Sequence, residues 1–215
     1  MTDRISAAEF RESADVEDWR VLWGGGYASA YFQTGSFVAG TALIHAIGEI
    51  AAAANHHPDV DLRPEGVTVR VFTRDAEGLT TRDVDLAQKI SAAAREQQVP
   101  ADPGAVQHVQ IAIDALDIAS VRPFWHAVLG YDEVGDEDLL DAHRSGPSFW
   151  FQQMDAARPQ RNRIHIDLYV PPDQAEARIA AALAAGGSIV NDDNAPEWWT
   201  LADPEGNEVD VAIWG

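Results

Sequence analysis

The sequence feature that most limits the possible folds of this chain is a segment near its middle that contains two prolines and a glycine. Residues 98–106 read QVPADPGAV and separate a helical pattern from a strand-like one. Proline and glycine interrupt regular structure, and such segments are typical of linkers between domains. The chain has 215 residues, so a break here leaves two parts of ordinary small-domain size. We therefore predict two domains, residues 1–100 and residues 106–215.

The first half predicts an antiparallel sheet with helices on one face. Two short apolar segments on either side of the glycines at 24–26 predict a hairpin, and alternating valines at 67–72 predict a further strand. Helical patterns cover residues 6–18, 37–55 and 81–97. Strands and helices mixed in this way within about 100 residues are typical of an α+β domain.

The second half predicts two tandem βαβββ units, also of the α+β class. Each unit has one helical pattern, at residues 120–129 and 172–185. The strands of the first unit are expected at 108–113, 131–134, 139–143 and 148–154, and those of the second at 163–170, 188–190, 198–202 and 208–214. The matching order of elements indicates an internal structural repeat.

Charge and composition exclude several classes of partner and chemistry. The formal net charge is −20, so the protein repels phosphate backbones and anionic lipid surfaces. We therefore expect neither nucleic acid nor a membrane as a partner. The chain has no cysteine, which excludes disulfides and thiolate chemistry. The N-terminus lacks the apolar core of a signal peptide, and no run approaches the roughly 18 apolar residues of a membrane span, so a cytoplasmic location is expected.

Two adjacent histidines, His56 and His57, follow the long helical pattern and precede Pro58. Imidazoles exchange protons near neutral pH and are therefore suited to general acid–base catalysis. On spacing alone, a helix-end cap or incidental surface histidines are the alternative interpretation.

The sequence around this pair, NHHPDVDLRPEGVTVRVFTRDAEGLTTRDVDLAQKI, resembles the pterin-4a-carbinolamine dehydratase family over about residues 15–97. The matching positions are His56, His57, Pro58, Gly78, Leu79, Thr80, Arg82, Asp83, Leu86 and Ala87, with Phe32 and Phe37 at aromatic positions upstream. The resemblance implies elimination of water from a 4a-hydroxytetrahydropterin, with His56 and His57 as catalytic residues and no metal or cofactor.

The chain departs from the family pattern at three positions. The family's third histidine falls on Arg74, its acidic residue before the pair on Ala52, and an aromatic residue on Pro64. Arginine stays protonated and cannot exchange a proton at neutral pH. Either a weakened dehydratase remains, with Arg74 binding the polar edge of the pterin and Glu49 replacing the acidic residue, or the site binds a ligand without turnover. The residues expected to contact the substrate are Arg74, Arg82, Asp83 and Glu49.

The second half carries a candidate metal site. His108, His165 and Asp210 lie on three predicted strands, and two imidazoles with one carboxylate form a recurring set of ligands for divalent metals. Strand histidines that are merely packed are the alternative. The segments RNRIHIDLYV and LADPEGNEVDVAIW resemble glyoxalase-like (vicinal oxygen chelate) proteins over residues 106–215. This resemblance implies His108, His165 and Asp210 as ligands of a divalent metal, with Gln152 in the fourth position.

Five aromatic residues of the second half are expected either to line an apolar pocket for a planar ligand or to belong to the core: Trp125, Trp150, Phe151, Trp198 and Trp199. Taken together, the sequence favours a pterin dehydratase-like enzyme fused to a glyoxalase-like small-molecule domain. The alternative is a degenerate pterin-binding or dimerisation module attached to a metal-dependent or ligand-binding domain. By analogy with both families, we expect a homo-oligomer.

Overall fold

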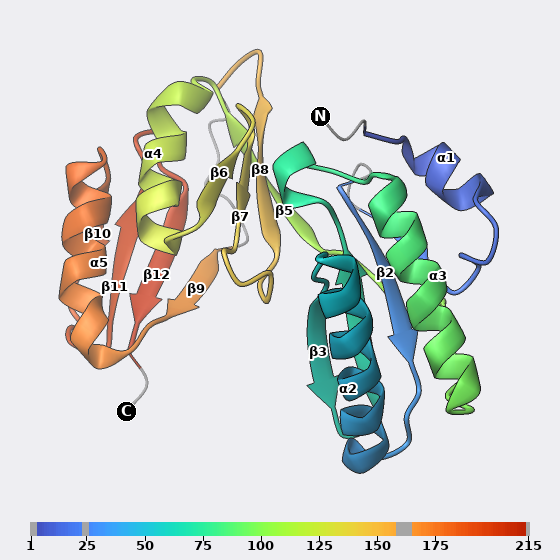
Figure 1. Cartoon of the computed structure of the whole chain (residues 1–215). Coiled ribbons are helices and arrows are strands. Elements are labelled where there is room, and N and C mark those ends of the chain that lie inside the picture. Colours follow the sequence, from blue (N-terminus) through green and yellow to red (C-terminus); the bar gives the residue numbers. More distant parts are fainter. Residues whose placement is uncertain (1–3, 23–25, 158–164, 214–215) are drawn as a thin grey trace. The chain divides into compact units, whose positions relative to one another are not determined.

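A computed structural model describes residues 4–22, 26–157 and 165–213. The chain divides into two compact units, residues 1–108 and 109–215 (Figure 1). The first part of the predicted linker belongs to the first unit, because the backbone N–H of Gln33 donates to the Pro100 carbonyl and that of Asp102 to the Tyr31 carbonyl. The boundary therefore lies slightly later than the prolines suggested.

The first unit contains one fully antiparallel sheet with the strand order β1-β2-β4-β3. Its strands are β1 (Arg20–Leu22), β2 (Tyr27–Phe32), β3 (Asp59–Arg63) and β4 (Gly66–Val71). The hairpin β1-β2 was predicted, although residues 24 and 25 of its turn lie outside the described residues. Strand β3 was missed, because three of its five residues are charged and it lies at the edge of the sheet, where only one side of the backbone is paired.

Three α-helices accompany this sheet: α1 (Ala7–Glu12), α2 (Phe37–Ala54) and α3 (Thr81–Glu96), with a short 3-10 turn, η2, at Arg74–Ala76. The hydroxyls of Ser36 and Thr80 cap α2 and α3 at the predicted starts. Helix α1 is shorter than predicted. After Ser13 the chain leaves the helix, and the turn that follows places Val16 and Trp19 in the core.

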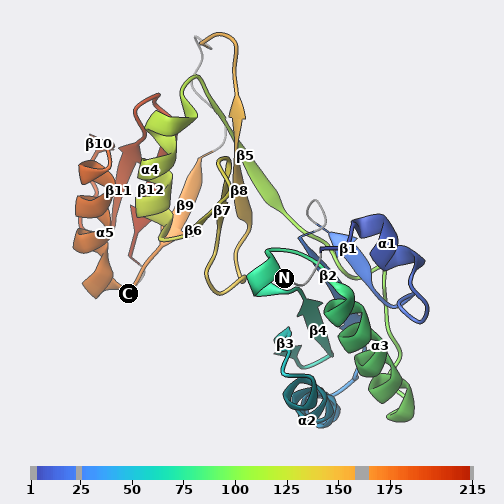
Figure 2. The ribbon, with the colours of Figure 1, turned by 45° about the horizontal axis from the view of Figure 1, so that its top comes forward.

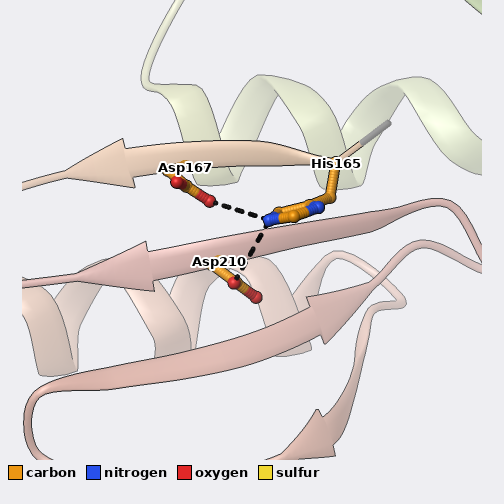
Figure 3. Close-up of side chains that lie close together, drawn as sticks. All are labelled: His165, Asp167 and Asp210. Carbon is orange, nitrogen blue, oxygen red and sulfur yellow. Dashed lines mark ion pairs between the residues drawn. The ribbon is translucent and has the colours of Figure 1, made fainter. Parts of the chain in front are cut away.

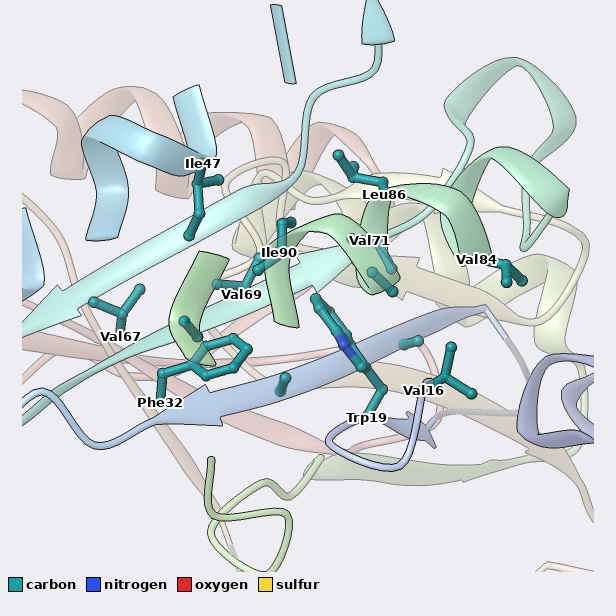
Figure 4. Packing of buried hydrophobic residues seen from close by; sticks show 14 of the residues in the cluster. Val16, Trp19, Phe32, Ile47, Val67, Val69, Val71, Val84, Leu86 and Ile90 are labelled. Carbon is teal, nitrogen blue, oxygen red and sulfur yellow. The ribbon is translucent and has the colours of Figure 1, made fainter. Parts of the chain in front are cut away.

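Helices α2 and α3 lie side by side and contribute to a core on one face of the sheet (Figures 1 and 2). Figure 4 shows Ile47 of α2 and Ile90 of α3 packed with Val67 and Val69 of β4. Buried Trp19 donates from its indole Nε1 to the hydroxyl of Ser91, which satisfies both polar groups. The antiparallel sheet with helices on one face is thus confirmed.

By length and composition alone, α2 is apolar enough to cross a membrane, contrary to the expectation that no segment approaches this. Core helices of soluble proteins pass the same test but are mostly buried, whereas 22% of α2 is buried. Its buried face includes Leu43, Ile47 and Ala51, which pack against the sheet and α3. Its exposed face carries Phe37 and Val38 as well as polar His45.

The second unit repeats one topology twice. Its elements are β5 (Gln110–Ala115), α4 (Ile118–Leu129), β6 (Asp132–Val134), β7 (Asp138–Leu140) and β8 (Ser148–Gln153), followed by β9 (Ile166–Tyr169), α5 (Pro172–Ala184), β10 (Ser188–Asn191), β11 (Trp198–Ala202) and β12 (Glu208–Ala212). The sheet orders are β5-β8-β7-β6 and β10-β11-β12-β9. In each sheet the first strand pairs in parallel with the last, as β5 with β8 and β9 with β12. The predicted tandem βαβββ units are confirmed, while residues 163, 164 and 214 of the predicted strands lie outside the described part.

One core joins both repeats of the second unit, with α4 and α5 side by side (Figure 1). Trp125 and Phe151 are fully buried in it, and Trp199 packs against it. These three residues are therefore core residues and not pocket lining. Only Trp150 and Trp198 lie on the opposite face of their strands, because side chains alternate along a strand.

Candidate functional site

The first candidate site is centred on His56, directly after α2. Asn55 ends this helix in a left-handed conformation, with φ 46° and ψ 42°, which turns the chain back toward the start of α3. There His56 Nε2 lies 2.7 Å from the Asp83 carboxylate oxygen Oδ1. Both side chains are buried, with 8% of the His56 side chain and none of Asp83 exposed.

Asp83 is held by donors from two further residues. Its Oδ2 accepts hydrogen bonds from the Thr73 hydroxyl at 2.7 Å and from the Thr80 backbone N–H at 2.8 Å, with the Thr80 hydroxyl at 3.1 Å. Thr80 and Asp83 together form the capping box of α3. Because a carboxylate only accepts, His56 Nε2 is the donor of their shared hydrogen bond. In the neutral form of the ring, the opposite nitrogen, Nδ1, is an acceptor.

Of the two adjacent histidines, His56 is buried and His57 is exposed. The expected role of Asp83 is corrected. Asp83 was expected to contact a substrate, yet it is fully buried and both its oxygens are occupied by protein donors. Its role in the structure is to orient His56.

Arg74, which stands where the family has a third histidine, forms an ion pair with Asp59, the first residue of β3. Its Nη2 donates to Asp59 Oδ1 at 2.7 Å, and its guanidinium lies 4.6 Å from the centre of the Phe72 ring. The side chain of Arg74 remains 60% exposed, so it keeps donors that face solvent. The other oxygen of Asp59, Oδ2, is buried and has no hydrogen-bond partner among the described residues.

Arg82 and Glu49, the other two residues expected to contact the substrate, make their interactions with residues other than His56. Arg82 donates from Nη2 to the backbone carbonyl of Asn55 at 3.0 Å and so ties α3 to the end of α2. Glu49 is exposed and lies 3.6 Å from His45, one turn earlier on α2. At His45, 79% of the side chain is exposed. Among the described residues, Glu49 is therefore paired with His45 and not with His56.

Sequence reasoning missed Asp59 and Thr73 in this site. Asp59 directly follows Pro58, and its role depends on β3, the strand that was not predicted. Thr73 contributes through a hydroxyl that is buried between η2 and α3, which no local pattern reveals.

The second candidate site lies on the face of the β9–β12 pair opposite the core (Figure 3). His165 Nε2 is 3.3 Å from Asp167 Oδ1 and 3.9 Å from Asp210 Oδ2. Asp167 and Asp210 are register partners on the two parallel strands. On the neighbouring strand β11, the Thr200 hydroxyl donates to Asp210 Oδ1 at 2.6 Å. Asp167 was missed, although its spacing of two from His165 places both on one face of a strand.

The four expected metal ligands are divided between the two units. His108 precedes β5 and closes the first unit, where its Nδ1 lies 2.8 Å from the Tyr27 hydroxyl. Burial, and then the nearby charge of Arg70, lower the pKa of His108. Gln152 is exposed on β8, in the other sheet of the second unit. Among the described histidines and carboxylates, the group that converges is His165 and Asp210 with Asp167, and His108 is not part of it.

Comparison with protein-family models gives one match for each unit. The family model for pterin 4 alpha carbinolamine dehydratase matches residues 3–93. The model for the glyoxalase-like domain matches residues 110–212. Together the two matches account for nearly all of the chain.

Curated relatives match the first unit at substantial identity. A protein of Nocardia farcinica named "Putative pterin-4-alpha-carbinolamine dehydratase" is 43% identical over 81 residues, which cover 38% of this chain and 83% of the relative. A Roseiflexus protein of the same name is 40% identical over 91 residues, covering 42% of this chain and 96% of the relative.

Solved structures are similar to parts of the chain at low identity. A transcriptional coactivator/pterin dehydratase from Brucella melitensis is 22% identical, covers 43% of this chain and 99% of its own, and has a TM-score of 0.40. A glyoxalase-related enzyme from Fulvimarina pelagi is 16% identical, covers 50% of this chain and 88% of its own, and has a TM-score of 0.41.

Proposed function

Because the chain belongs, through its first unit, to the pterin 4 alpha carbinolamine dehydratase family, we propose that it eliminates water from a 4a-hydroxytetrahydropterin at His56 and His57. The observation that carries the proposal is the buried hydrogen bond between His56 and Asp83. It leaves an oriented imidazole with one acceptor nitrogen, which is the equipment of a general base.

The reaction needs two proton transfers and no redox step. The bond between C4a and its hydroxyl oxygen breaks, and hydroxide leaves poorly unless an acid protonates it to water. A ring nitrogen loses its proton to a base, and the product is a quinonoid dihydropterin. An imidazole can serve in either transfer near neutral pH.

We assign the roles from burial and from hydrogen bonding. His56 Nδ1 accepts the ring proton, because Asp83 occupies Nε2 and stabilises the imidazolium that forms. Exposed His57 contacts the leaving hydroxyl from the solvent side and, as its imidazolium, donates the proton with which it leaves as water. Arg74, which cannot exchange a proton, binds the polar edge of the pterin with the donors that Asp59 does not use.

A second candidate is pterin binding without turnover, which the contact between Arg74 and Asp59 favours. Where the family has a third histidine, which can exchange a proton, this chain has the permanently charged Arg74. Its Nη2 lies 2.7 Å from Asp59 Oδ1, and its guanidinium lies over the Phe72 ring. A cation over an aromatic ring suits recognition of a polar, planar ligand.

The test is the rate of 4a-carbinolamine dehydration by the purified chain, compared with buffer alone. General acid–base catalysis contributes roughly 10²–10⁴-fold, so His56→Ala is expected to lower the rate by at least about 100-fold, or to that of buffer. His45→Ala is the matched control, because this imidazole is exposed on α2 and its ion-pair partner among the described residues is Glu49.

The outcomes separate the two candidates. A wild-type rate equal to that of buffer rejects the dehydratase. If a stable pterin nevertheless binds and Arg74→Ala abolishes the binding, the second candidate holds. The second unit is glyoxalase-like, and we propose that it acts on or binds a small molecule of its own.

A further inference from the structure

We propose that His165, Asp167 and Asp210 together bind one divalent metal ion, with Asp167 as a ligand in place of His108 and Gln152. This inference goes beyond the dehydratase proposal and does not depend on it, because all three residues belong to the second unit.

The ligand atoms already converge. One atom from each side chain lies within 4.8 Å of the other two, on adjacent strands of one sheet. Ligand atoms around one small divalent ion lie about 3–4 Å apart, given metal–ligand distances of about 2.1 Å. The distances of 3.3 Å and 3.9 Å from His165 Nε2 to the two carboxylates fall in this range (Figure 3).

The charges at the site favour a cation. Two carboxylates face one imidazole, and neither Asp167 nor Asp210 has an arginine or lysine partner within the described residues. Asp210 is the least exposed of the three, with 22% of its side chain accessible. Such a pair of acids is costly to hold together without a counter-ion, and a divalent ion balances it.

Asp210 is oriented as a metal ligand would be. Its Oδ1 accepts the 2.6 Å hydrogen bond from Thr200, while Oδ2 is the oxygen directed at His165. Hydrogen-bonded carboxylates of this kind are typical of metal sites, because a hydrogen-bond partner that does not touch the metal fixes the orientation of the ligating carboxylate. The His165 and Asp167 side chains are about half exposed, at 54% and 49%, so an ion can enter from solvent.

The ligand types indicate which metals fit. Carboxylates suit Mg²⁺, Ca²⁺ and Mn²⁺, and imidazole suits the later first-row metals. One imidazole with two carboxylates therefore fits Mn²⁺, and three protein ligands leave coordination positions open. All three ligands come from the second βαβββ repeat, so the site does not need the first repeat.

The experiment is a titration of the full-length protein with Mn²⁺, after treatment with a chelator and its removal. Free Mn²⁺ is measured by its electron paramagnetic resonance signal. We expect one Mn²⁺ per chain in the wild type and a loss of affinity of at least about 100-fold in His165→Ala, Asp167→Ala and Asp210→Ala. Thr200→Val is expected to lower affinity by about 10–100-fold, as is typical when an outer partner is removed.

His108→Ala and Gln152→Ala are the controls and should bind Mn²⁺ as the wild type does. Asp173→Ala, at the start of α5, controls for unspecific binding to an acidic surface. Circular dichroism confirms that each variant is folded. Absence of saturable binding up to about 1 mM, the weak end of protein cation sites, overturns the proposal. So does binding that survives Asp167→Ala but is lost in His108→Ala or Gln152→Ala.

Discussion

At the scale of single residues, Asp83 connects the stability of the first unit with its proposed chemistry. The same carboxylate caps α3 through Thr80 and orients His56 through its other oxygen. A buried polar network of this kind rigidifies its members only while all of them are satisfied. A change at Asp83 should therefore alter stability and activity together.

We predict that Asp83→Asn lowers the free energy of unfolding by about 1–3 kcal/mol, because an amide cannot accept all the hydrogen bonds of the carboxylate. We also expect a loss of dehydratase activity of at least about tenfold, since His56 loses the acceptor that fixes its tautomer. Chemical denaturation and the dehydration assay measure the two effects.

Ser91→Ala is the control for Asp83→Asn. It removes a buried hydrogen-bond partner of Trp19 in the same unit, without contact to the histidines. It should cost stability and leave the rate unchanged. If Asp83→Asn behaves in the same way, Asp83 is a helix cap only, and the orienting role is rejected.

The residues of the candidate sites were predictable only in part. Adjacent histidines before a proline are a local pattern, and they led to His56 and His57, whereas Asp83 came from the resemblance to the pterin dehydratase family. The partners of these residues come from elsewhere in the chain, as Thr73 does, and the role of Asp83 follows from burial. For the same reason His108 was grouped with His165, although its contact with Tyr27 is a tertiary one.

At the scale of elements, the second unit was predictable because each βαβββ repeat has strong strand and helix patterns. The strands differ from expectation by a few residues at their ends, as where β5 begins at Gln110 and leaves His108 outside. In the first unit the charged edge strand β3 gave no apolar alternation. Helix α1 ended early because Val16 and Trp19 are needed in the core, which its helical pattern could not show.

The turn between β7 and β8 contains a carboxylate whose ionised form holds the backbone. Burial raises the pKa of Asp141, but the Ser145 hydroxyl and the backbone N–H groups of His143, Gly146 and Ser145 outweigh this and lower it from 3.8 to about 2. A depressed pKa in the folded state contributes stability above the unfolded pKa. That contribution is lost as the pH falls through the folded value.

We therefore predict that Asp141→Asn costs about 1 kcal/mol at pH 7, a value already reduced for solvent screening at this partly exposed turn. The difference from wild type should shrink as the pH falls from about 4 toward 2, because the wild-type carboxyl is then protonated as well. Denaturation at several pH values measures it. Asp136→Asn, at an exposed position nearby, should show no such trend, and a difference that stays constant down to pH 2 contradicts the assignment.

At the scale of the whole molecule, the two units have separate hydrophobic cores. The core of the first unit is built by β2, β4, α2 and α3, and that of the second by both βαβββ repeats, with no residue in common. Since the free energy of folding comes mainly from burial of apolar surface, each unit has its own source of stability. The candidate sites are divided in the same way, with His56 in the first unit and His165 in the second.

This division predicts that a cavity in one core leaves the other unit intact. Ile90 is fully buried in the first core, and Ile90→Ala should cost about 2–5 kcal/mol there, because it removes buried methyl groups and leaves a cavity. Hydrogen exchange should become faster at the amides of β4 and stay unchanged at those of β12. Val38→Ala, at a position 78% exposed on α2, should change neither. If protection at β12 falls together with that at β4, the two units unfold as one, and neither site can be assigned to an independent domain.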